Sequence, residues 1–178
     1  MSLTVFNAAL WLLVCLQLTA CGLAQTVGDA SAATAKALFY KQVNTLHLDF
    51  TGRAALNTYM TDMNALSVTT LVRVYQLRDS QLMQRAAYES LLDDGSTVLA
   101  ADLLGEHAVV IKPGEGARLD VPLAEDARFV AVVALFRQPD LRAHSWRLIV
   151  PREALHPDRA RVVELADNRL VLRRLAED

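Results

Sequence analysis

Hydrophobic and polar residues alternate along much of the chain from position 46 onward. The first such segment contains Leu46, Leu48 and Phe50, separated by polar residues, and this period of two predicts a half-buried β-strand. Seven later segments show the same alternation or a run of β-branched and apolar residues: 68–78, 107–113, 117–123, 128–137, 144–150, 161–165 and 169–175. Strands that follow one another through short turns predict a mostly β protein, an antiparallel β-sandwich of about eight strands.

Between the second and third predicted strands, the spacing of apolar residues changes from the period of two to a helical period. Asp79-Ser80 offers a helix N-cap, and apolar residues then recur at helical spacing up to Leu91. We expect a helix over 80–92, ended by Gly95, and a second short helical piece over 96–104. The pattern therefore predicts a helical insertion at about 80–104. The nearly all-apolar segment 128–137 is typical of a central strand that is covered on both faces.

The first 20 residues contain no charged side chain. Their apolar stretch from Val5 to Leu18 is too short to cross a bilayer comfortably, and its length is typical of a signal-peptide core. The residues that follow, Leu18-Thr19-Ala20-Cys21, resemble a bacterial lipobox. They indicate that the leader is cleaved before Cys21 and that Cys21 carries the lipid. The alternative is an ordinary buried helix with a chance cysteine.

Residues 22–37 are small and polar, without periodicity, which is typical of a flexible tether. The sequence thus predicts a signal peptide over 1–20, an acylated cysteine and tether over 21–43, and a β-sandwich domain over 44–178. Gly22 follows the cysteine. Since an Asp at that position favours retention at the inner membrane, Gly22 points to the outer membrane, with the domain facing the periplasm.

Composition and charge limit the classes of function that we expect for this chain. The 178-residue chain is 53% hydrophobic with a formal net charge of −2, so we expect no nucleic-acid binding. The four histidines have no metal-ligand spacing, and no nucleophile motif is present. We therefore expect a protein without a metal, a cofactor or catalysis. The glycine-rich stretch at 113–116 predicts a plain turn rather than a phosphate loop.

Two segments remain as candidate contact sites. The loop over 52–67 is unusually apolar, and methionine and tyrosine side chains adapt well to interfaces. Its apolar residues either meet a partner or cap the end of the sandwich. The arginines of the last strand, Arg169, Arg173 and Arg174, either form a charged edge that discourages strand addition or contact a partner or lipid headgroup.

Several short motifs together resemble the type VI secretion outer-membrane lipoproteins, the TssJ (SciN, VasD) family. The motifs, in order, are Arg73-Val74-Tyr75-Gln76-Leu77, Asp102-Leu103-Leu104, Pro113-Gly114-Glu115, the stretch 128–150 with Trp146, and Asn168 before Leu170. Their order and spacing carry the resemblance, which covers about 44–175 and the lipobox. It implies a transthyretin-like sandwich with an added helical element.

The resemblance also implies a role and a partner. Lipoproteins of this family bind the periplasmic C-terminal region of TssM, the large inner-membrane subunit, and through it the TssL-like subunit indirectly. The loop between the first two strands makes much of that contact, and it corresponds to 53–66 here. We expect Leu56, Tyr59, Met60 and Met63 to be apolar anchors, with Asn57 and Asp62 fixing polar register. The alternative is a lipoprotein that binds a small ligand such as a peptide or sugar.

Overall fold

The first alternating segment forms strand β1 (Thr45–Gly52) in the computed structural model, which describes residues 43–58 and 66–175. Leu46, Leu48 and Phe50 are at most 2% exposed and face the core, while the residues between them lie on the outer face. Burying every second side chain of a strand gives it one apolar and one polar face. The period of two therefore predicts both the strand and its orientation.

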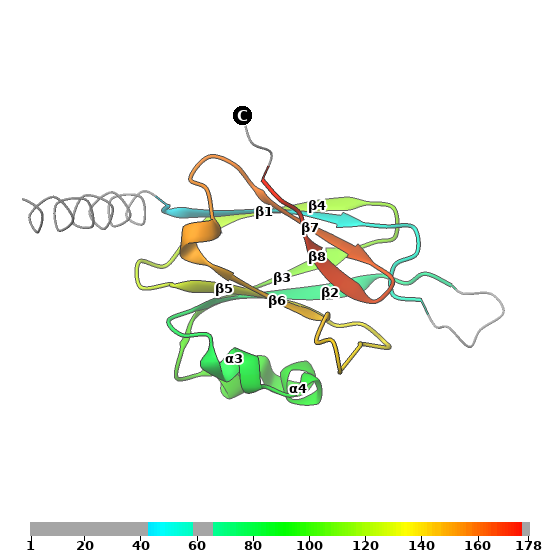
Figure 1. Ribbon diagram of the computed structural model, residues 1–178, viewed down its shortest axis with the longest axis horizontal. Helices are drawn as coiled ribbons and strands as arrows, with labels where there is room; N and C mark the ends of the chain where they lie inside the picture. Colours follow the sequence, from blue (N-terminus) through cyan, green and yellow to red (C-terminus); the bar gives the residue numbers. More distant parts are fainter. Residues whose placement is uncertain (1–42, 59–65, 176–178) are drawn as a thin grey trace, which may run out of the picture. The chain divides into compact units, whose positions relative to one another are not determined.

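Two four-stranded sheets pack face to face around one hydrophobic core (Figure 1). The first sheet has the order β4-β1-β7-β8, with β4 (Gly116–Pro122), β7 (Arg161–Ala166) and β8 (Arg169–Leu172). The second has the order β3-β2-β5-β6, with β2 (Thr70–Leu77), β3 (Leu103–Ile111), β5 (Phe129–Ala134) and β6 (Arg147–Pro151). The predicted mostly β sandwich of eight strands is confirmed. Neighbouring strands are antiparallel except β1 and β7, which are parallel.

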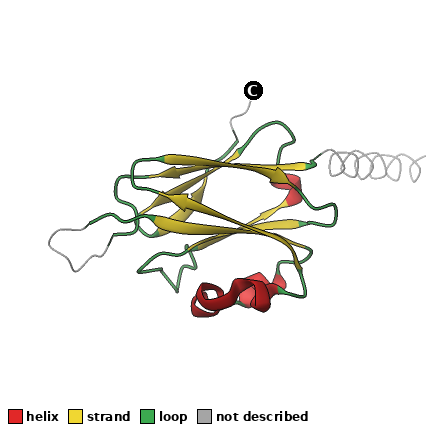
Figure 2. Ribbon diagram, turned by 180° about the vertical axis from the view of Figure 1, so that it is seen from behind, coloured by secondary structure: helices red, strands yellow, loops and turns green. Residues whose placement is uncertain are grey.

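A layer of two helices, α3 (Gln81–Arg85) and α4 (Tyr88–Leu99), covers the outer face of the second sheet (Figures 1 and 2). Arg73 on β2 reaches this layer and donates from Nη1 to the carbonyl oxygen of Leu91, 2.7 Å away. On the neighbouring strand β5, Ala131 and Val133 lie on the same face and are fully buried. β5, the nearly all-apolar segment, is therefore covered on both faces, as its composition predicts.

The helices end at different residues from those that the sequence predicts. Instead of one helix over 80–92, the chain leaves α3 in an extended conformation at Ala86 (ψ 134°) and starts α4 two residues later. α4 is itself kinked at Asp94, where φ is −147°. The second piece, expected over 96–104, stops earlier because Leu103 already pairs in β3.

An arginine from a distant strand stabilises the end of α3. Arg147 on β6 donates to the carbonyl oxygens of Met83 and Gln84, both at 2.6 Å, and of Ala86 at 3.0 Å. The last carbonyls of a helix have no partner within the helix and attract a cation. Arg147 also stacks over Trp146, 4.8 Å from the ring centroid. The break between the helices is therefore held by a contact that local sequence does not reveal.

The two ends of the sandwich differ in what they connect. At the end where β1 begins, which we call the anchor end, the described chain starts at Val43. At the opposite end, the loop end, four connections meet: 53–69, 112–115, 135–146 and 167–168. β1 has eight residues, so the two ends lie about 25 Å apart along that strand.

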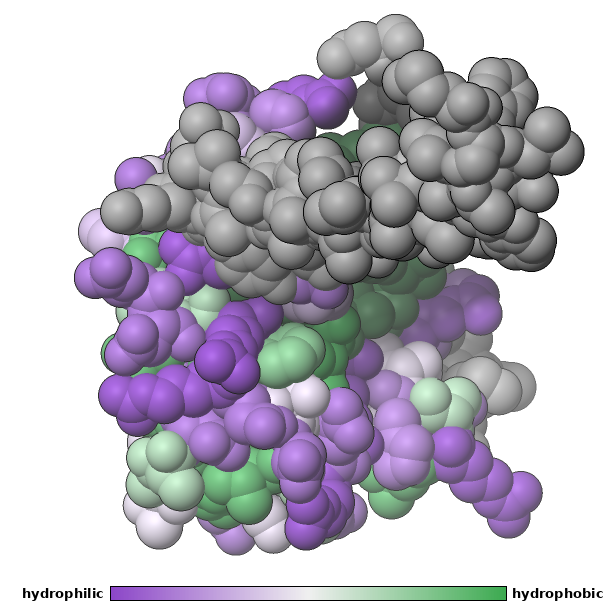
Figure 3. All heavy atoms as spheres, turned by 60° about the vertical axis from the view of Figure 1, so that its left-hand side comes forward, coloured by the Kyte–Doolittle hydropathy of each residue, from purple (hydrophilic) through white to green (hydrophobic). Residues whose placement is uncertain are grey.

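One buried arginine holds the start of the domain at the anchor end. Arg152, in a single 3₁₀ turn (Arg152–Ala154), is 5% exposed. Its guanidinium donates to the carbonyl oxygens of Ala124, Glu125 and Ala127 at 2.8–3.0 Å and to that of Val43 at 2.7 Å. Figure 3, which turns this side of the molecule forward, shows mostly hydrophilic residues around smaller hydrophobic areas where grey atoms do not cover it.

The described residues belong to one compact unit, Lys41–Asp178. The predicted signal peptide (1–20) and nearly all of the predicted tether (21–43) lie outside the described residues, as does Cys21, so these boundaries stay predictions. Within the described part of the chain, no helix has the length and apolar character needed to cross a membrane.

Candidate functional site

The loop that follows β1 is the main candidate site, and its base is described on both sides. Arg53 N donates to Leu165 O at 2.9 Å, which fixes the start of the loop to β7. On the returning side, Val68 N donates to Leu56 O at 3.2 Å and Ser67 Oγ donates to Ala54 O at 2.5 Å. The two sides of the loop are thus bonded to each other before the chain enters β2.

Leu56 and Asn57 support the loop rather than present themselves to a partner. Leu56 is fully buried in the core, so it has no exposed surface to serve as the predicted apolar anchor. Asn57 is 2% exposed and has a left-handed backbone with φ 52°. Its side chain accepts a bond from Arg137 N at 2.7 Å and donates to Thr69 O at 3.5 Å. The predicted contact role of these two side chains is corrected by their burial.

The other predicted contact residues, Tyr59, Met60, Asp62 and Met63, lie outside the described residues. Their role stays a prediction. Leu66, where the described chain resumes, is 70% exposed, which is high for a large apolar side chain. The apolar composition that singles out this loop therefore has two outcomes, since Leu56 caps the sandwich and Leu66 faces solvent.

The turn between β7 and β8 holds the loop from the side. Asp167 and Asn168 both have positive φ, 47° and 61°, as expected at the centre of a tight hairpin turn. Asp167 N donates to Ala55 O at 2.9 Å, and Asn168 Nδ2 donates to Thr58 O at 3.0 Å. The sequence predicts this hairpin but not its contact with the loop, because the bond from Asn168 joins residues 110 positions apart.

The connection 135–146 completes the loop end and is fixed to the helix layer. Tyr88 on α4 donates from its hydroxyl to Phe136 O at 2.5 Å and packs edge-on against Trp146, with ring centroids 5.1 Å apart. Burial raises the pKa of the Tyr88 hydroxyl to about 12, so it stays protonated and can donate. Leu141 in this connection is 47% exposed. The loop end therefore presents exposed apolar side chains on a base fixed by hydrogen bonds.

The arrangement suits binding between polypeptides. Among the described residues, no group of three or more His, Cys, Asp or Glu side chains could hold a metal ion. What the loop end offers is a set of connections from both sheets, brought together by backbone and side-chain hydrogen bonds. Loops held on a rigid sandwich are a common way to build a protein-binding surface.

Comparison with known proteins places the chain among components of one secretion system. Residues 44–168 match the family model described as type VI secretion lipoprotein, VasD, EvfM, TssJ. No curated protein matches the sequence significantly.

Three solved structures illustrate the similarity. A chain of "T6SS protein TssM C-terminal domain (869-1107) from EAEC" is 32% identical with a TM-score of 0.67, and the match covers 75% of this chain and 100% of that one. A chain of "Type VI membrane complex" is 35% identical with a TM-score of 0.68, covering 73% and 98%. The Serratia marcescens protein Lip, a membrane-bound component of the type VI secretion system, shares the fold at 21% identity, covering 75% and 99% with a TM-score of 0.65.

Proposed function

We propose a function from one premise: the chain belongs to the type VI secretion lipoprotein family of VasD, EvfM and TssJ. The protein is an outer-membrane lipoprotein, not an enzyme, that faces the periplasm. Acylated Cys21 fixes it to the membrane, and the loop end docks the periplasmic C-terminal domain of a TssM-like inner-membrane protein. Through that protein it connects indirectly to a TssL-like subunit and anchors the membrane complex.

The lipobox supports the anchoring step. Leu18-Thr19-Ala20-Cys21 follows an apolar leader, and Gly22 leaves the position after the cysteine free of the Asp that favours the inner membrane. Each buried methylene of an acyl chain contributes about 0.8 kcal/mol, and two chains already give stable membrane residence. The tether over 22–37 then keeps the domain close to the bilayer but free to turn.

The distance between the two ends of the domain supports the docking step, and this observation carries the proposal. The described chain begins at Val43 at one end, and the described ends of the loop, 53–58 and 66–69, lie about 25 Å away at the other. A tether attached at Val43 therefore leaves the loop end accessible. Tethering also raises the local concentration of the domain, so that a modest interface suffices.

The identity of the partner is supported by the matched solved chain from EAEC. Three quarters of this 178-residue chain covers all of the matched chain, which is therefore much shorter than the span 869–1107 named for the TssM domain. A structure described by its TssM domain thus also contains a chain similar to this one. A TssM-like C-terminal domain is accordingly the partner that we expect here.

Binding of the soluble domain tests the docking step. Residues 38–178 contain the whole compact unit, and the matched solved chains are almost completely covered by it. We expect this domain to retain the periplasmic C-terminal domain of the TssM-like protein from the same bacterium in a pull-down. Replacing Tyr59, Met60 and Met63 by Ala together should abolish retention and leave the circular dichroism spectrum unchanged. Loss of binding to a peptide or sugar, with retention of the protein partner, would favour the ligand-binding alternative.

Fractionation tests the anchoring step. We expect Cys21→Ser to leave the domain folded but free in the periplasm, and to stop secretion. Mass spectrometry of the wild-type protein should show an acylated Cys21 at its N-terminus. A Cys21→Ser protein that still fractionates with outer membranes and supports secretion would contradict this step.

A further inference from the structure

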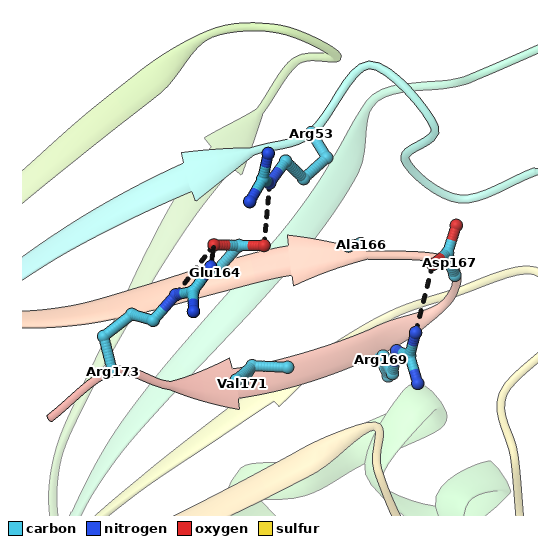
Figure 4. A pocket seen from close by; sticks show the side chains of 7 residues that line it. All are labelled: Arg53, Glu164, Ala166, Asp167, Arg169, Val171 and Arg173. Carbon is cyan, nitrogen blue, oxygen red and sulfur yellow. Dashed lines mark hydrogen bonds and ion pairs between the residues drawn. The ribbon is translucent and has the colours of Figure 1, made fainter.

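A shallow pocket of about 450 Å³ lies on the outer face of the first sheet, beside the loop end (Figure 4). We call it the arginine pocket. It lies between the end of β1, the outer faces of β7 and β8, and the turn that joins those two strands. The side chains that give it its character are Arg53, Glu164, Asp167, Arg169, Val171 and Arg173.

Glu164 holds two of the guanidinium groups in place. Its carboxylate, 13% exposed, accepts a bond from Arg53 Nε at 2.7 Å and, on its other oxygen, from Arg173 Nε at 2.9 Å and Arg173 Nη2. These bonds hold the pKa of the Glu164 carboxyl below its ordinary value, so it stays charged. Arg53 donates only through Nε within the described residues, which leaves its two Nη groups for a ligand. The two guanidinium groups are therefore ordered before anything binds.

The pocket carries an excess of positive charge in a chain whose formal net charge is −2. Three arginines line it against Glu164 and Asp167. The side chains of Arg53, Arg169 and Arg173 remain 50–57% exposed despite their ion pairs, so they stay accessible. Guanidinium groups bind carboxylates through paired hydrogen bonds, and ordered groups lose less freedom when they do.

The pocket adjoins the loop that we propose as the docking site. Arg53 is the first residue after β1, and its backbone is bonded to Leu165. On the other side, Asp167 N donates to Ala55 O within the same loop. A polypeptide that covers the loop end can therefore extend onto the pocket. The described chain begins at the other end of β1, so the tether is attached away from the pocket.

We propose that the arginine pocket binds a carboxylate side chain, Asp or Glu, of the protein that docks at the loop end. This inference rests on the proposed function and adds to it the chemistry of one contact. It also gives a role to two of the C-terminal arginines, because Arg169 on the edge strand β8 and Arg173 directly after it both line the pocket.

Two substitutions that change the charge of the pocket in opposite directions test the proposal. Arg169 has its ion pair with exposed Asp167 alone within the described residues, so Arg169→Glu reverses a charge without breaking the contacts of Glu164. Asp167→Asn removes a negative charge from the rim, and Asn tolerates the left-handed backbone at this position. Arg128→Glu is the matched control, since Arg128 is exposed at the anchor end and the change in net charge is the same.

Affinities of the domain 38–178 for the TssM-like periplasmic domain are measured by calorimetry at several NaCl concentrations. We expect Arg169→Glu to weaken binding about five- to tenfold, Asp167→Asn to strengthen it about twofold, and Arg128→Glu to change it less than twofold. The affinity of the wild-type domain should fall more steeply with salt than that of Arg169→Glu. Circular dichroism confirms that each variant is folded.

Other outcomes overturn the inference in distinguishable ways. If the wild-type domain binds its partner and both pocket variants bind equally well, the carboxylate contact is absent and the proposed function stands. If the wild-type domain does not bind at all, the proposed function fails and the inference fails with it. If Arg169→Glu reduces binding to vesicles of anionic phospholipid while partner binding is unchanged, the pocket serves a lipid headgroup instead.

Discussion

At the scale of single residues, buried polar side chains hold the connecting segments of the sandwich. Gln76 on β2 is 2% exposed, donates to Pro122 O at 2.8 Å and accepts from Ala124 N at 2.7 Å, so it ties one sheet to the end of the other. Arg152 does the same at the start of the domain. A buried polar group needs its hydrogen bonds satisfied, which makes these residues more sensitive to substitution than exposed ones.

Arg152→Met tests this view. Methionine keeps an unbranched, flexible side chain, although a shorter one, and cannot donate to the four carbonyl oxygens that Arg152 binds. We expect the free energy of unfolding to fall by about 2–4 kcal/mol, because buried carbonyls lose their partners. Urea denaturation measures the change. Arg128→Met, at an exposed site nearby, should stay within about 0.5 kcal/mol of wild type, and an equally small effect at Arg152 would contradict the assignment.

The ion pairs of Glu164 predict a dependence of stability on acidity. Arg53 and Arg173 hold the folded-state pKa of Glu164 below its ordinary value of 4.5. A lowered pKa contributes stability above the unfolded-state value, and this is lost as the pH falls through the folded-state value. We expect Glu164→Gln to be less stable than wild type at neutral pH and the difference to shrink below pH 4.5. Urea midpoints across a pH series measure it, and a constant difference would contradict the prediction.

Sequence predicts single residues well where the backbone imposes a period. Leu46, Leu48 and Phe50 are buried as their alternation predicts. Leu56 and Asn57 are not predictable in this way, because an apolar or amide residue in an irregular loop can face either inward or outward. Asn57 and Arg152 are also fixed by bonds to residues 80 and up to 109 positions away, for which local sequence gives no signal.

At the scale of elements, the helix layer depends on one close approach. Gly95 on α4 lies against Tyr75 on β2, and a Cβ atom built at Gly95 would lie 2.2 Å from the Tyr75 hydroxyl oxygen and 3.0 Å from Cζ. The sequence predicts Gly95 as the end of a helix. Its role in the structure is to let the helix lie on the sheet.

Gly95→Ala therefore pushes α4 away from β2, and we expect it to reduce the free energy of unfolding by about 1–3 kcal/mol. Tyr75→Phe removes the clashing oxygen, which makes no hydrogen bond of good geometry within the described residues although Arg73 and Glu106 lie near it, so this change alone should cost less than Gly95→Ala. The double variant should recover part of the loss. Urea denaturation of the four proteins measures the coupling. Strictly additive effects would show that the clash is not the cause.

Strand positions are predictable from sequence to within a few residues, but helix ends are not. A period of two marks the strands with one face on the core, such as β1, and a nearly all-apolar run marks β5, which is covered on both faces. The division between α3 and α4 is stabilised by Arg147, which comes from β6, and the α4 kink at Asp94 has no local apolar signal. Contacts between distant segments decide these boundaries.

At the scale of the whole molecule, the number of strands, the sandwich and the family are all recoverable from sequence, since the motifs keep their order and spacing. The pairing of strands is not. The parallel alignment of β1 with β7 joins segments more than 100 positions apart, and a hydrophobic period does not specify a neighbour. For the same reason the approach of the β7–β8 turn to the loop 53–69 emerges only in the folded domain.

Because the compact unit begins at Lys41, we expect the tether to add no stability to the domain. We expect the domain 38–178 and the mature chain 21–178 carrying Cys21→Ser to melt within about 2 °C of each other, because the core lies inside the shorter protein. Differential scanning calorimetry measures both midpoints. A clearly lower midpoint for the shorter protein would mean that residues 21–37 pack against the domain.

The central place of β1 in the first sheet has a mechanical consequence. If the bilayer pulls on the chain before Val43 and a docked partner pulls on the loop after Gly52, tension runs along β1 itself. That strand is bonded to β4 on one side and to β7 on the other. Because β1 is already extended, its covalent backbone carries this tension, and the hydrogen bonds to its neighbours are not sheared. Under the proposed function, such a load would therefore leave the rest of the sandwich intact.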